Sequence, residues 1–95
     1  MYTLSAKLTF SIYHADSLKD KRRVCRSVIE KTRHRFNATV AEVGSQDSLH
    51  VMIIGVAVVS GDAAHARDMI DEILRFMEGH ADAELTEVQV GSYVI

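Results

Sequence analysis

Residues 2–12 read YTLSAKLTFSI, and along this stretch apolar and polar side chains alternate. The apolar side chains occupy the even positions from Tyr2 to Ile12, whereas serine, threonine and lysine occupy the odd ones. Successive side chains of a strand point to opposite faces, so the pattern predicts a strand with one face in the core and one face open. A sheet covered on one side is therefore the framework into which the rest of the chain has to fit.

A helix is predicted soon after this strand. Ser17 can act as the N-cap, and Asp20 follows three residues later, which makes a variant of the capping box. From Leu18 to Phe36 apolar side chains recur at spacings of three and four, and Asn37 then offers a left-handed stop. We expect a helix over this range.

The second half of the chain repeats the design with one additional strand. Strands are expected at 38–43 and 49–59 with a turn at 44–47, then a helix from a start at 60–62 to a stop at Gly79, and a strand at 85–95. With right-handed crossovers, this order gives an α+β fold of the ferredoxin-like split βαββαβ kind. We expect a four-stranded antiparallel sheet with two helices on one face, in a single domain over residues 1–95.

The charges are divided unevenly along the chain. Eight of its eleven lysine and arginine residues lie between Lys19 and Arg35. Residues 1–40 carry nine basic and three acidic side chains, whereas residues 41–95 carry two basic and ten acidic ones. Because the formal net charge is only −2, this basic segment stands out from the rest of the protein and indicates an anionic partner.

Part of the basic segment is predicted to form one exposed stripe on the first helix. On a helical wheel of about 100° per residue, five cations fall side by side next to the apolar face. They are Lys19, Arg22, Arg23, Arg26 and Arg33. Glu30 follows Arg26 by four residues and is expected to pair with it. Lys21 falls within the apolar sector, and Lys31 and Arg35 fall on the opposite flank.

The basic stripe, as we call these five residues, predicts a non-catalytic RNA-binding or ribosome-associated accessory protein. Arginine forks match phosphate geometry, and each neutralised phosphate releases counterions. The run at 49–59 contains no aromatic residue, which argues against base stacking on the sheet. DNA and acidic proteins also fit the charge, so a protein–protein interaction module or a homodimeric structural protein without nucleic acid stays open. A helix whose cations serve only solubility is a further alternative, although such a helix would mix signs.

No catalytic, metal-binding or cofactor-binding constellation is recognised in the sequence. The five histidines stand at no ligand spacing to one another or to Cys25. Cys25 falls on the apolar face of the first helix, where burial makes a thiol unreactive. We therefore expect no enzyme activity, no metal and no cofactor.

The third strand suggests a homodimer, because both of its faces are apolar. A strand covered by helices on one side should alternate, yet residues 49–59 do not. Either long neighbouring side chains such as Lys7, Tyr13 or Tyr93 cover the second face, or another subunit does. We predict a homodimer through the open sheet face, with Leu49, Val51 and Ile53 in the interface.

The expected location is cytoplasmic. A single cysteine excludes an internal disulfide, and no leader precedes the first strand. The longest apolar run, residues 51–59, is about half of what crosses a bilayer as a helix, so no membrane association is expected.

Several short strings resemble the small bacterial YlxP-like family, a domain of unknown function. They are SLKDKRRV at 17–24, RFN at 35–37, AEV at 41–43, QD at 46–47 and GVAVVS at 55–60. The resemblance implies a ferredoxin-like fold and, because genes of the family commonly lie among transcription and translation factors near ribosome-binding factor A, an RNA or ribosome role. It implies no catalytic residues. Leu49, His50 and Val51 depart from the aromatic and polar residues that are usual at the entry to the third strand.

Overall fold

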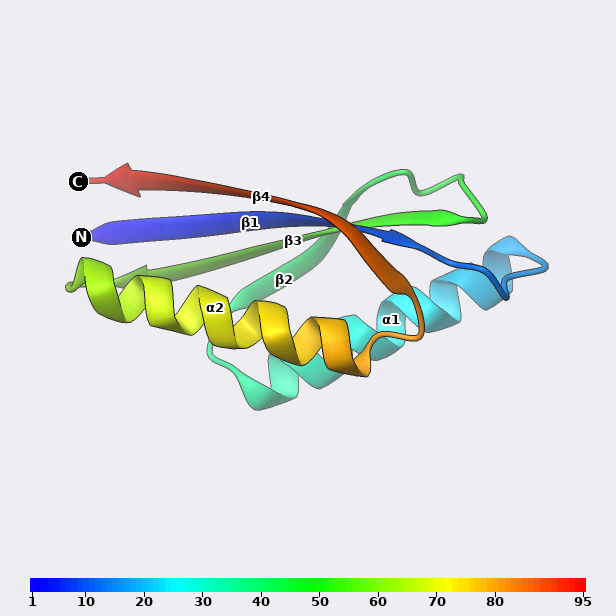
Figure 1. Ribbon diagram of the computed structural model, residues 1–95, viewed down its shortest axis with the longest axis horizontal. Helices are drawn as coiled ribbons and strands as arrows, with labels where there is room; N and C mark the ends of the chain where they lie inside the picture. Colours follow the sequence, from blue (N-terminus) through cyan, green and yellow to red (C-terminus); the bar gives the residue numbers. More distant parts are fainter.

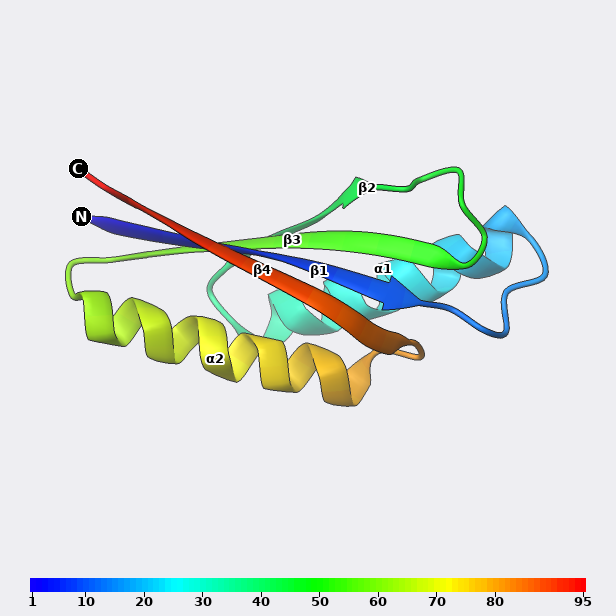
Figure 2. The ribbon, with the colours of Figure 1, turned by 45° about the horizontal axis from the view of Figure 1, so that its top comes forward.

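The structure is a computed structural model that describes all 95 residues. Its six elements are β1 Tyr2–Ser11, α1 Leu18–Arg35, β2 Thr39–Gly44, β3 Val51–Ser60, α2 Ala63–His80 and β4 Glu84–Val94. The strands form one sheet in the order β2-β3-β1-β4, and every neighbouring pair is antiparallel. Both helices lie on the same side of the sheet (Figures 1 and 2). The predicted ferredoxin-like α+β fold is confirmed.

The core lies between the sheet and the helix layer. The even residues of β1 from Leu4 to Phe10 are buried there, as the alternation predicts. Even residues of β3 from Met52 to Val58 are buried beside them, since β1 and β3 are the two central strands. α1 packs on β2, whereas α2 packs on β1 and β3. The opposite face of the sheet carries no helix (Figure 2).

β4 lies largely outside the cover of the helices. Val88 pairs with Leu8 and Val90 with Ala6, so both valines point toward the helix side of the sheet. They are nevertheless 38% and 56% exposed, and Val94 is 59% exposed. In Figure 1 the two chain ends lie side by side, where β1 begins and β4 ends.

α1 begins as predicted but ends differently. The Ser17 hydroxyl accepts from the Asp20 amide at 3.2 Å, and the Asp20 carboxylate accepts from the Asp16 amide at 3.3 Å. The predicted left-handed stop at Asn37 is wrong, because Ser45 is the only non-glycine residue with positive φ. The helix ends instead at Arg35, with an extended Phe36 as its C-cap, whose amide donates to the Thr32 carbonyl oxygen. The chain bends at residues 36–38 before β2 begins.

The predicted end of α2 is also wrong, because Gly79 lies inside the helix. The last turn is held by His80, whose ring stacks on Phe76 at a centroid distance of 3.9 Å. The His80 Nδ1 atom also lies 2.8 Å from the Phe76 carbonyl oxygen. These contacts stabilise the end of the helix, which runs one residue beyond the glycine to His80 and has Ala81 as its C-cap. At the other end, Asp62 is the N-cap and accepts from Ala64 at 3.0 Å.

β3 begins at Val51, two residues later than predicted. Leu49 and His50 belong to the loop that follows β2, where Ser45 takes a left-handed conformation with φ of 55°.

Neither helix is long and apolar enough to cross a membrane.

Candidate nucleic-acid interface

All five residues of the basic stripe are exposed on α1. Arg22, Arg26 and Arg33 line a hollow of about 420 Å³ between α1 and β2. Arg23 and Arg26 border a second hollow of about 270 Å³ farther around the helix. Arg26 therefore lies at the centre of the stripe, with guanidinium groups on both of its sides.

Ion pairing within the stripe is sparse. Arg23 lies 3.9 Å from Asp20, and its side chain is 71% exposed, so solvent weakens this contact. The expected pair between Arg26 and Glu30 is not formed, since the only other ion pair in the protein joins Lys21 and Glu42. Lys19, Arg22 and Arg26 thus have no acidic partner within the protein.

Arg33 differs from the rest of the stripe because it binds the backbone of β2. Its Nε and Nη2 atoms donate to the Val40 carbonyl oxygen at 3.1 and 2.6 Å. β2 is an edge strand, so this carbonyl would otherwise point at solvent. Arg33 covers it and keeps its remaining N–H groups free for a ligand.

Beneath the stripe lies a buried ion pair that the sequence reasoning missed. Lys21 is fully buried, and its Nζ atom donates to Glu42 at 2.9 Å and to the carbonyls of Ser45 and Gln46 at 2.8 and 3.4 Å. These bonds join the first turn of α1 to β2 and to the loop after it. A signal was present in the sequence, because a lysine in the apolar sector of a helix needs a carboxylate as its partner. Glu42 follows Val40 by two residues in β2 and therefore points to the same, helix-covered side of the sheet.

Cys25 lies in the core as predicted, and it is 3% exposed. Burial, reinforced by the negative charge of Glu42, raises the pKa of its thiol to about 11. The thiol is therefore protonated at neutral pH and is a poor nucleophile. No group of three or more histidine, cysteine or carboxylate side chains is placed to hold a metal ion.

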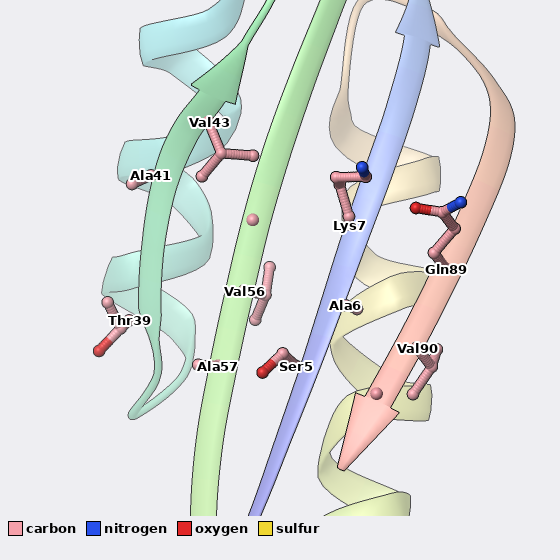
Figure 3. Close-up of a pocket in the computed structure, with 12 residues that line it drawn as sticks. Ser5, Ala6, Lys7, Thr39, Ala41, Val43, Val56, Ala57, Gln89 and Val90 are labelled. Atoms are coloured by element: carbon pink, nitrogen blue, oxygen red, sulfur yellow. The ribbon is translucent and has the colours of Figure 1, made fainter. Parts of the chain in front are cut away.

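The open face of the sheet carries a shallow trough of about 560 Å³ (Figure 3). Its floor is made of small residues, among them Ser5, Gly55 and Ala57, with Val43 on one side and Lys7 on the other. Val51 and Ile53 are half-buried on this same face, and Leu49 is half-buried in the preceding loop. The homodimer predicted through these three residues stays a prediction.

A ferredoxin-like α+β domain with an arginine-rich first helix is the class of protein that this fold and surface define. Residues 3–90 match the family model described as a protein of unknown function, DUF503. The chain belongs to this family. It is 31% identical over 75 residues to the uncharacterized protein YlxP of Bacillus subtilis (strain 168), covering 79% of this chain and 82% of YlxP. The YlxP-like resemblance is thereby confirmed.

Among solved structures, the de novo designed protein Ferredog-Diesel is similar at a TM-score of 0.48 and 13% identity. The match covers 94% of this chain and 83% of the designed protein.

Proposed function

We propose that this protein is a non-catalytic RNA-binding protein that holds RNA phosphates along α1. The observation that carries the proposal is the exposed row of Lys19, Arg22, Arg23 and Arg26, three of which have no acidic partner. Unpaired arginines close together on one helix repel one another, and an anionic ligand relieves that repulsion.

The hollow between α1 and β2 supports a phosphate as the ligand. Arg22, Arg26 and Arg33 line it, so their guanidinium groups can approach one anion from several directions. Of the two carboxylates there, Glu42 is already paired with Lys21, which leaves Glu30 as the opposing charge. Cations are therefore in excess at this site.

The surface supports phosphate contacts more than base readout. The centre of the open sheet face is lined by small side chains, with none of the stacked aromatic residues on which sheet-based RNA domains bind bases. Phosphate contacts position a protein without reading sequence, so we expect weak sequence preference. The ribosome is the RNA partner we name, since the YlxP-like resemblance implies it.

The test is RNA binding by two matched double variants. Arg22→Glu/Arg26→Glu reverses two cations of the hollow, whereas Arg35→Glu/Arg75→Glu makes the same charge change at the junction of the two helices. Binding is measured by fluorescence anisotropy with a single-stranded RNA and by co-sedimentation with bacterial ribosomes. In both assays the first variant should lose binding and the second should keep it. Equal loss in the two variants would show a general charge effect and would contradict the proposal.

Salt dependence gives a second readout. If about four phosphates are neutralised, log affinity should fall against log salt with a slope of about −3 for a single strand. A salt-independent affinity would contradict phosphate contacts by the stripe. Partners recovered from cell extract that survive nuclease treatment would favour an acidic protein partner instead.

A further inference from the structure

The free edge of β4 has a regular pattern of unpaired backbone groups. Met1 and Ile95 exchange two hydrogen bonds, of 2.8 and 3.0 Å, and bonded pairs in an antiparallel ladder alternate with non-bonded ones. Gln89, Gly91 and Tyr93 therefore bond to β1. The N–H and C=O groups of Val88, Val90, Ser92 and Val94 point away from the sheet, and no side chain binds them.

We propose that this edge pairs with the same edge of a second copy, in antiparallel orientation about a two-fold axis at Gly91. The sheets of the two copies then become one continuous sheet.

The pairing satisfies the backbone of both copies. Val88 lies opposite Val94 of the second copy and Val90 lies opposite its Ser92, and all four residues direct their N–H and C=O groups outward. Each such pair exchanges two bonds, so the interface contains about eight backbone hydrogen bonds. Gly91 faces Gly91 as a non-bonded pair, which brings its two backbones closest and suits a residue without a side chain.

The side chains of β4 are also compatible with the pairing of two copies of this strand. Residues 88–95 read VQVGSYVI and contain no charged side chain, so the side chains of the two copies meet without charge repulsion. The valines of both copies fall in one row on the helix side, where α2 leaves them exposed. β4 also lacks proline and lysine, the residues that commonly block edge pairing.

The open sheet face is a less suitable place for a second copy. Lys7 projects from its middle between Gly55 and Gln89, and no carboxylate pairs with it. Two such faces packed together about a two-fold axis would bring two lysines toward each other without a counter-charge. The edge pairing avoids this cost.

The first test compares Ser92→Pro with Val43→Lys in light scattering. Proline at position 92 removes an outward N–H and leaves the bonds to β1 intact, so this variant should be a monomer where the unaltered protein is a dimer. Val43 is exposed on the open face, and its lysine variant should stay dimeric. An unaltered protein that is monomeric up to its solubility limit, or a dimer lost only with Val43→Lys, would overturn the proposal.

Cysteine cross-linking tests the register. Gly91→Cys places two cysteines whose Cα atoms lie about 4.5 Å apart across the axis. A Cβ atom at this position meets nothing within 4 Å in its own subunit beyond its chain neighbours. This variant should form a disulfide-linked dimer under oxidation. Gln89→Cys is the matched control, because its copies lie about 13 Å apart along the strand. Equal cross-linking of the two variants, or none for Gly91→Cys, would contradict the register.

Discussion

The two edges of the sheet are built in opposite ways. β2 has six residues and a register shift after Glu42, and its outward Val40 carbonyl is bound by Arg33. β4 has eleven residues, with a register shift between Leu85 and Glu87, and leaves the outward backbone groups from Val88 to Val94 free. A short edge with a covered backbone resists pairing with other strands, whereas a long edge with free backbone groups invites it. The cations gather beside the β2 edge, so the proposed RNA surface and the proposed self-association edge lie on opposite sides of the protein.

Among the changes at the β2 edge, Glu42→Ala should have the largest effect on stability. The change leaves the buried Lys21 ammonium without its carboxylate and should lower the free energy of unfolding by about 3 kcal/mol. Urea denaturation followed by circular dichroism measures it. The double variant Lys21→Met/Glu42→Leu is the control and should recover most of the loss, because both charges are gone. A single variant within 1 kcal/mol of the parent would show that the pair does not hold this edge together.

Two glycines compare the surroundings of the edges, with smaller expected effects, because Gly55 of β3 lies against Val43 of β2 and Gly91 lies on β4 itself. A methyl group on Gly55 would lie 2.9 Å from Val43 Cγ1, whereas one on Gly91 meets nothing within 4 Å. Gly55→Ala should therefore cost about 1 to 3 kcal/mol through overpacking. Gly91→Ala should stabilise by about 0.5 kcal/mol, because glycine inside a strand is unfavourable. Thermal unfolding of dilute protein measures both, and adding Val43→Ala should rescue Gly55→Ala. Equal changes in stability for Gly55→Ala and Gly91→Ala would contradict the predicted difference in packing at the two positions.

Within the basic stripe, alanine variants of Arg33 and Arg26 should differ, the first affecting mainly stability and the second mainly RNA binding. Arg33→Ala uncovers the Val40 carbonyl and should cost about 1 kcal/mol, since the bond is charge-assisted but solvent-accessible. Arg26→Ala should leave the free energy of unfolding unchanged and should weaken RNA binding more than Arg33→Ala does. Chemical denaturation and anisotropy on the same samples give both values. The reverse order in either measurement would contradict the assigned roles.

Most of the fold could be predicted because each strand and helix carries its own periodicity. The alternation of residues 2–12 and the Ser17 cap place β1 and the start of α1 within a residue of their observed positions. The helix ends were predicted less accurately. α2 passes through Gly79, and its last turn carries the stack of His80 on Phe76, an i, i+4 pair that an interpretation based on the glycine alone overlooks.

The candidate site was predicted less completely, because two of the residues in and beneath it have their partners on another element. The wheel correctly placed five exposed cations on one helix, because exposure follows from helical geometry. It could not show that Arg33 reaches the Val40 carbonyl or that Lys21 reaches Glu42, since both partners lie on β2 and become neighbours only in the folded sheet. The open edge of β4 likewise follows from strand order and register rather than from residues 84–94 alone.

Amide hydrogen exchange along β4 tests the contrast between the edges most directly. At high protein concentration, the amides of Val88, Val90, Ser92 and Val94 should exchange slowly, and on dilution they should become fast. The amides of Gln89, Gly91 and Tyr93 should stay protected at both concentrations, because they bond to β1. If the four outward amides exchange fast at every concentration, the edge is unpaired and the proposed difference between β2 and β4 has no role in assembly.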